Sequence, residues 1–143
     1  MIRTLFDGSV LVTAVVDQLG NHEAAFGALH RYTSGRHQGF CSTHTLAECY
    51  ATLTALPLPT RVLPGEARAL VQESLSERLT VIELTVDDYH SVLRQVAKLG
   101  LASGAIYDAL AQCAQKASTN RILTYNVSDF ERFRLPGIAV MTP

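Results

Sequence analysis

The sequence contains no tryptophan and only three cysteines in 143 residues. Cys41, Cys49 and Cys113 form no CxxC pair, so we expect neither a disulfide framework nor a zinc site built on paired cysteines. They are interpreted as small apolar residues of a protein in a reducing compartment. No apolar stretch approaches the roughly 18 residues that a membrane span requires, and the N-terminal segment has too short an apolar core for a signal peptide. We therefore expect a cytoplasmic protein without membrane contact.

Neither sign of charge predominates, because 12 basic residues stand against 13 acidic ones and the net charge is −1. A broad basic surface for nucleic acid is therefore not expected, although a local basic patch is compatible with this composition. Hydrophobic residues make up 48% of the chain, which is typical of a folded protein. A chain of this length can bury a sizeable core, and we expect residues 1–143 to form one domain.

Short apolar runs alternate with longer segments of helical periodicity. Most of the runs lack polar alternation, as do strands that are buried on both faces of a parallel sheet. Strands are expected at residues 2–6, 39–42, 79–84, 121–125 and 137–141. Helices are expected near residues 10–18, 22–33, 44–55, 62–76, 86–99 and 104–118, with a short helix after residue 126. The pattern predicts an α/β fold of three layers, α/β/α, with a mostly parallel central sheet of about five strands.

Polar side chains follow several of these strands, or lie in the first turns of the next helices. They are Asp7, Glu48, Asp108, Asn126 and Asp129. In open parallel sheets, ligands bind beyond the carboxyl ends of the strands, so these residues are the first candidates for a site. Carboxylates that are gathered there repel one another unless a cation lies among them. Hard oxygen ligands favour Mg²⁺ or Mn²⁺, and such ions promote the hydrolysis of phosphodiesters.

The first candidate also has an ordinary structural explanation. Asp7 could cap the N-terminus of the first helix by accepting a backbone N–H. Ser9 could do the same, which would leave Asp7 without a structural duty. Glu48 and Asp108 stand at comparable positions after strands, which favours a ligand role for Asp7. Gly8 and Ser9 would then form the turn that orients its side chain.

The other candidates have comparable alternatives. Thr45 to Glu48 matches a capping box, in which the glutamate binds the backbone N–H of the cap residue. A carboxylate at Asp108 is favoured by the helix dipole. Ser128 or Asp129 could cap the short helix that follows the fourth strand.

In several segments the chain resembles PIN-domain proteins, and more narrowly the VapC-type toxins of bacterial toxin–antitoxin pairs. The resemblance rests on FDGSVLV, THTLAECYATLT, SGAIYDALAQCAQKA, and ILTYNVSDFERF followed by GIAVM. It covers nearly the whole chain, and the order and spacing of YDALAQCA and TYNVSDF are its most specific part.

The resemblance implies an endoribonuclease that depends on Mg²⁺ or Mn²⁺ and hydrolyses RNA with metal-activated water. Asp7 and Asp108 match the usual metal ligands, and Glu48 matches the acid that completes the cluster. Ser9 and Thr124 match polar positions that support the site. The resemblance also implies a cognate antitoxin protein as partner and a homodimer.

The chain departs from the family pattern at the fourth acidic position. Asn126 stands where many members carry aspartate, so it can offer a carbonyl oxygen but no charge. Asp129 could supply the missing charge or only cap the short helix.

Two other classes of function are compatible with parts of the sequence. The chain could be a PIN-like module that binds RNA or a protein partner without cleaving, with Asn126 marking a decayed site. A phosphoacceptor receiver domain also clusters acids at strand ends. The sequence lacks the adjacent acid pair near Asp7 and the lysine after a late strand that a receiver requires.

Three further features are open from the sequence alone. Tyr107 could stack on a base or pack in the core. His44 and Glu48 are spaced i, i+4, so they could chelate a metal ion, or His44 could be a surface residue. The helical segments between residues 44 and 76 could form an apolar groove for an antitoxin peptide.

Overall fold

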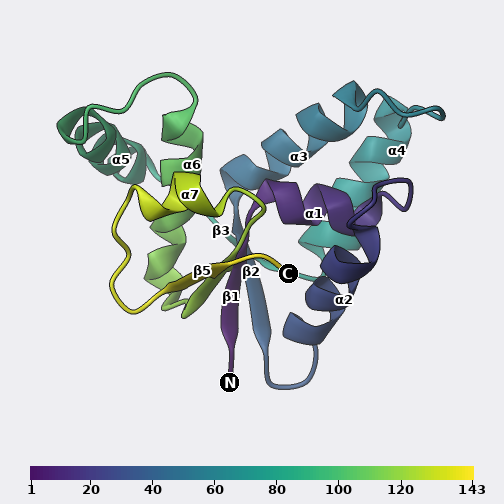
Figure 1. Cartoon of the computed structure of the whole chain (residues 1–143), viewed down its shortest axis with the longest axis horizontal. Helices are drawn as coiled ribbons and strands as arrows, with labels where there is room; N and C mark the ends of the chain where they lie inside the picture. Colours follow the sequence, from purple (N-terminus) through teal and green to yellow (C-terminus); the bar gives the residue numbers. More distant parts are fainter.

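A parallel sheet of five strands forms the centre of the computed structural model, which describes residues 1–143 with the exception of the side chain of Cys113 (Figure 1). The strands are β1 (Arg3–Phe6), β2 (Gln38–Ser42), β3 (Thr80–Ile82), β4 (Arg121–Leu123) and β5 (Ala139–Met141). Their order in the sheet is β3-β2-β1-β4-β5, and every neighbouring pair is parallel. Because β1 lies at the centre, its carboxyl end is flanked by those of β2 and β4.

The helices cover both faces of the sheet, as the sequence predicts. Their bounds are α1 (Gly8–Val15), α2 (His22–Tyr32), α3 (Thr43–Ala55), α4 (Pro64–Ala69), α5 (Val86–Lys98), α6 (Ala105–Ala111) and α7 (Val127–Glu131). In Figure 1, α1 to α4 lie to one side of the sheet and α5 to α7 to the other. No helix in the described structure is both long and apolar enough to cross a bilayer.

Two of the expected helices change their winding partway along. The segment expected at 62–76 begins as α4 and continues as a π-helix, η1 (Leu70–Ser76). The segment expected at 104–118 begins as α6 and continues as a 3₁₀-helix, η2 (Gln112–Ala117). Cys113, which is expected to be a small apolar residue, lies in this segment, but its side chain is outside the described part of the structure.

Side chains of the central strands alternate between two apolar cores. Phe6 and Leu123 belong to the core under α1, α2 and α3, whereas Leu5 and Ile122 belong to the core on the opposite face. All four are at most 1% exposed. A strand that is buried on both faces shows no polar alternation in its sequence, which explains the apolar runs.

Candidate active site

Asp7 follows the last residue of β1 and occupies the N-cap position of α1, but its side chain makes no capping hydrogen bond. Instead, Oδ2 of Asp7 accepts hydrogen bonds from Ser9 Oγ and Thr124 Oγ1, both at 2.8 Å. The residue is only 9% exposed. Two hydroxyl donors therefore fix the orientation of this carboxylate and leave Oδ1 available as a ligand.

The expectation that Ser9 caps the first helix is wrong. The helix begins at Gly8, directly after the strand, so Ser9 already lies in its first turn. Its hydroxyl donates to Asp7 and accepts from the backbone N–H of Tyr125 at 3.1 Å. Ser9 thus ties the start of α1 to the end of β4.

Thr124 also connects the end of β1, at Asp7, to the segment that follows β4. It is completely buried, and its hydroxyl donates to Asp7 while accepting from the backbone N–H of Asn126 at 2.9 Å. The structure therefore places both residues that were expected to support the site, Ser9 and Thr124, directly against Asp7.

Glu48 lies on α3, beyond its first turn. The helix begins at Thr43, and Ser42 caps it by accepting the backbone N–H of Thr45 at 3.2 Å. The interpretation of Thr45 to Glu48 as a capping box is therefore wrong, because the cap residue lies three residues earlier, at Ser42. The carboxylate of Glu48 instead lies with Oε1 2.7 Å from Nε2 of His44. Glu48 also lies near the start of α1, because a Cβ atom added to Gly8 would be 3.7 Å from Glu48 Oε2.

Asp108 lies in the first turn of α6, which begins after Gly104 as expected. Arg132 approaches it, with Nη2 3.7 Å from Asp108 Oδ2. The same guanidinium group lies 3.6 Å from Asp129 Oδ1. Arg132 therefore lies between the carboxylates of Asp108 and Asp129.

One cavity of about 240 Å³ brings the principal candidates together. The residues that line it are Asp7, Gly8, Ser9, Glu48, Thr52, Asp108 and Asn126. The carboxylates come from the end of β1, from α3 and from α6, which are far apart in the sequence. Thr52 was not predicted, although its place one turn after Glu48 is a signal that could have revealed it.

Of the two candidates for the fourth acidic position, Asn126 lines this cavity and Asp129 does not. Asn126 occupies the N-cap position of α7 without a side-chain capping bond, so the expectation that Ser128 or Asp129 caps this helix is wrong. The side chain of Asp129 is 47% exposed and is paired with Arg132. Asp129 acts on the site through its charge, because it contributes to the raised pKa of Asp108.

The acids are close enough to affect one another's protonation. Burial, followed by the charges of Asp7 and Asp108, raises the pKa of Glu48 to about 7. Burial and then the charges of Asp7 and Asp129 raise the pKa of Asp108 to about 6, although Arg132 opposes this shift. The cavity therefore concentrates negative charge that a cation would stabilise.

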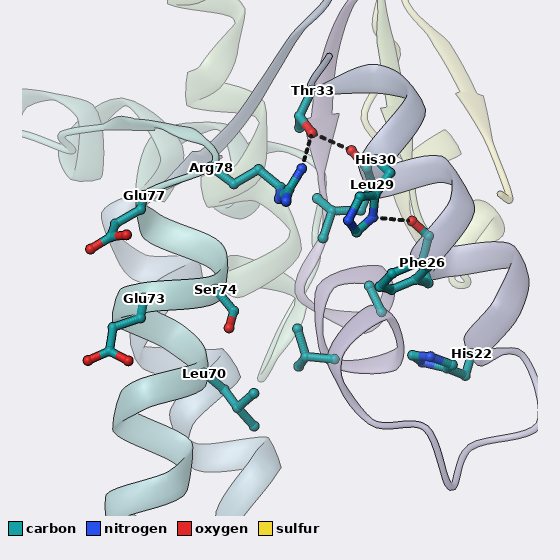
Figure 2. A pocket seen from close by; sticks show the side chains of 12 residues that line it. His22, Phe26, Leu29, His30, Thr33, Leu70, Glu73, Ser74, Glu77 and Arg78 are labelled. Carbon is teal, nitrogen blue, oxygen red and sulfur yellow. Dashed lines mark hydrogen bonds between the residues drawn. The ribbon is translucent and has the colours of Figure 1, made fainter.

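A separate groove of about 760 Å³ lies between α2 and η1 and contains none of these acids (Figure 2). Phe26 contributes from α2 and Leu70 from η1, and Arg78 reaches across so that Nη1 lies 3.4 Å from Thr33 Oγ1. The sequence led us to expect a groove within residues 44–76. The groove that the structure shows takes only one wall from that segment, and α2 supplies the other.

A five-stranded parallel sheet with helices on both faces, and acids gathered at its carboxyl edge, agrees with the PIN-domain class that the sequence resembles. Among curated proteins, ribonuclease VapC40 of Mycobacterium tuberculosis is 32% identical over 132 residues, which cover 90% of this chain and 92% of the relative. Ribonuclease VapC27 of the same species is 26% identical over 133 residues, covering 93% and 94%. The chain belongs to the VapC family of ribonucleases. No family model matches the sequence.

Solved structures show the same fold. The VapBC2 structure from Rickettsia felis, bound to a DNA fragment from its promoter, contains a chain that is 16% identical, with a TM-score of 0.66 and coverage of 99% of both chains. Mycobacterium tuberculosis VapC20, described as a toxin that cleaves the sarcin–ricin loop, also has a TM-score of 0.66 at 17% identity, covering 83% of this chain and 86% of its own.

Proposed function

We propose that this protein is the toxin of a toxin–antitoxin pair and an endoribonuclease that depends on Mg²⁺ or Mn²⁺, with the acid cavity as its active site. One observation carries the proposal: Asp7, Glu48 and Asp108 converge on one cavity from three separate elements. The curated relatives, which are named ribonucleases, support RNA as the substrate.

The donor set of the cavity fits a hard divalent cation. Its ligands would be carboxylate oxygens of Asp7, Glu48 and Asp108, which are the kind that Mg²⁺ and Mn²⁺ prefer. Asn126 would add a carbonyl oxygen or hold a water molecule. Among the described side chains, no three His, Cys, Asp or Glu residues already form a finished ligand set. Binding would therefore require a small movement, most readily of Glu48, whose Oε1 is turned toward His44.

Each residue of the cavity would have a distinct part in the reaction. When bound, the cation would activate water and stabilise the charge that develops on the phosphodiester. Ser9 and Thr124 would keep Asp7 in the orientation that ligation requires, as hydrogen bonds from the surroundings do for ligands in metal sites generally. Asp108, beside Arg132, would share the cation with Asp7. Cleavage would leave a 5′-phosphate and a 3′-hydroxyl.

The partners of the protein are also part of the proposal. Several similar folds come from VapBC complexes, which supports a cognate antitoxin as partner. We further propose a cytoplasmic homodimer built from single PIN-like domains of residues 1–143.

Cleavage assays with and without metal test the active site. The purified protein is incubated with structured RNAs in Mg²⁺, in Mn²⁺ and in EDTA, together with Asp7→Asn and Asp108→Asn variants. We expect cleavage only with metal and a loss of at least about 100-fold in each variant, because each removes a charged ligand. The matched control is Asp87→Asn, which changes an exposed acid in the first turn of α5 and should leave the rate unchanged.

Two outcomes would overturn parts of this proposal. Cleavage that persists in EDTA, or in both active-site variants, would exclude the metal site. Absence of cleavage across a wide panel of RNAs, together with tight binding to a partner, would favour a binding module in which Asn126 marks a decayed site.

A further inference from the structure

Two aromatic side chains from different helices stack beside the acid cavity. The rings of His44 on α3 and Tyr107 on α6 have centroids 5.0 Å apart and an interplanar angle of 12°. Tyr107 is nevertheless 53% exposed. Of the two roles that the sequence left open for Tyr107, packing in the core is therefore excluded, and α6 buries Ala109 and Leu110 instead.

The imidazole of His44 also lies close to an acid of the proposed site. Its Nε2 lies 2.7 Å from Glu48 Oε1, and among the described residues neither atom has another partner. The ring of Tyr107 therefore stacks on an imidazole that lies beside Glu48, an acid of the proposed site. Stacking on His44 orders the ring of Tyr107 in advance, which reduces the entropy that is lost when a planar ligand binds.

A cleft of about 460 Å³ opens beside this aromatic pair. Its lining consists of His44, Ala47, Glu48, Ala51, Thr52, Gly104, Tyr107 and Asp108. Three of these residues, Glu48, Thr52 and Asp108, also line the acid cavity, so the two spaces lie side by side. The volume lies within the range of roughly 300–1,000 Å³ that is typical of small-molecule sites.

We propose that His44 and Tyr107 form a stacking platform for one unpaired RNA base beside the scissile phosphate. The inference rests on the proposed function, because it assigns the acid cavity to the phosphate. A base offers the flat apolar face that an exposed aromatic ring binds well, and the small side chains of Ala47 and Ala51 leave room for it. The aromatic pair would thus select unpaired RNA, since a base within a duplex cannot enter the cleft.

The absence of tryptophan from the chain allows a direct test of the platform. Tyr107→Trp, made together with Asp7→Asn to suppress cleavage, carries a single tryptophan at the platform. We expect short single-stranded RNA to quench its fluorescence, and we expect one abasic substitution along the RNA to abolish the quenching. Tyr50→Trp in the same background is the matched control, because Tyr50 is a similarly exposed tyrosine of α3 outside the cleft.

Binding affinity provides a second measurement. Tyr107→Ala should weaken binding of single-stranded RNA by about 5- to 150-fold, the factor that corresponds to one stacked base. Tyr107→Phe keeps the ring and should bind as the parent does. Circular dichroism and thermal melting of each variant show whether the fold is retained.

The two proposals fail in different ways. If the wild-type protein cleaves RNA but Tyr107→Ala binds and cleaves with unchanged Kd and KM, the platform is wrong and the active site stands. If tryptophan at 107 is quenched as strongly by abasic RNA, or no more than tryptophan at 50, the platform is also wrong. If no RNA is cleaved while the quenching depends on one base, the platform stands without the nuclease.

Discussion

At the scale of single residues, the decisive feature is the way that Asp7 is held. A carboxylate at the N-cap of a helix ordinarily accepts backbone N–H groups of the first turn. Asp7 makes no such bond, and its Oδ2 instead accepts hydrogen bonds from the hydroxyl groups of Ser9 and Thr124. Side-chain hydroxyls, rather than the helix, therefore determine where this carboxylate points.

Thr124→Val tests this orientation. The substitution keeps the shape of a fully buried side chain but removes the hydroxyl that binds Asp7 and the backbone N–H of Asn126. We expect a loss of about 1–3 kcal/mol in the free energy of unfolding and a decrease of about 10- to 100-fold in metal affinity. Chemical denaturation and metal titration by calorimetry measure the two effects.

Thr124→Ser serves as the control because it retains the hydroxyl. It should keep metal affinity near that of the wild type, although the lost methyl group costs some stability. Equal metal affinities for the valine and serine variants would show that the hydroxyl does not position Asp7.

At the scale of the elements, β2 lies against its neighbours with little space to spare. A Cβ added to Gly39 would lie 2.6 Å from Thr33 Cγ2, 2.8 Å from Leu79 Cδ2 and 3.0 Å from Phe6 Cε2. Glycine therefore allows the segment after α2, the residue before β3 and the central strand β1 to close around β2.

Gly39→Ala is accordingly expected to destabilise the protein by about 1–3 kcal/mol, because an inserted methyl group must displace packed side chains. Gly27→Ala is the matched control. Gly27 is exposed within α2, and nothing lies within 4 Å of its added Cβ. Alanine there should stabilise by about 0.5–1 kcal/mol. Thermal melting measures the stability of both variants. A Gly39→Ala variant as stable as the wild type would show that the space around Gly39 can accommodate a methyl group.

At the scale of the whole molecule, folding itself assembles the negative charge. The three acids are distant along the chain and meet only when β1, α3 and α6 take their places around the sheet. Because the unfolded chain does not hold them together, burial and mutual repulsion raise the pKa values of Glu48 and Asp108 only in the folded state. We therefore expect the stability of the protein to depend on pH and on divalent cations.

The sign of the pH dependence follows from these shifts. The folded protein without metal holds the proton of Glu48 more tightly than the unfolded chain, so stability should fall as pH rises from 4.5 to about 7. Asp108 should contribute in the same direction between 3.8 and about 6. His44, whose pKa is lowered by burial, acts in the opposite direction below 6.5.

Melting curves in EDTA, recorded for the wild type and for Glu48→Gln, isolate the Glu48 contribution. Above neutral pH the glutamine variant should melt a few degrees higher than the wild type, and the difference should vanish near pH 4.5. Addition of Mg²⁺ or Mn²⁺ should raise the melting temperature of the wild type more than that of the variant. If the melting temperatures of the two proteins differed by the same amount at every pH, the titration of Glu48 would not be linked to stability.

Much of the architecture could be predicted because its causes are local. Apolar runs and helical periodicity identified all five strands and the helices within a few residues, since burial on both faces of a strand and one face of a helix leaves a direct pattern in the sequence. The errors concern caps. Ser9, Thr45 and Asp129 are suitable cap residues by type, but the exact start of each helix depends on where the preceding strand ends in the sheet.

The sequence by itself determined the α/β class and the placing of acids after strands, because both follow from periodicity over neighbouring residues. Only the tertiary structure decided which groups meet. Thr124 donates to Asp7 across 117 positions of the chain, and His44 stacks on Tyr107 from another helix. It also put Asn126 in the cavity and left Asp129 outside it. Such contacts depend on the order of the strands and the packing of the helices, which no short stretch of sequence specifies.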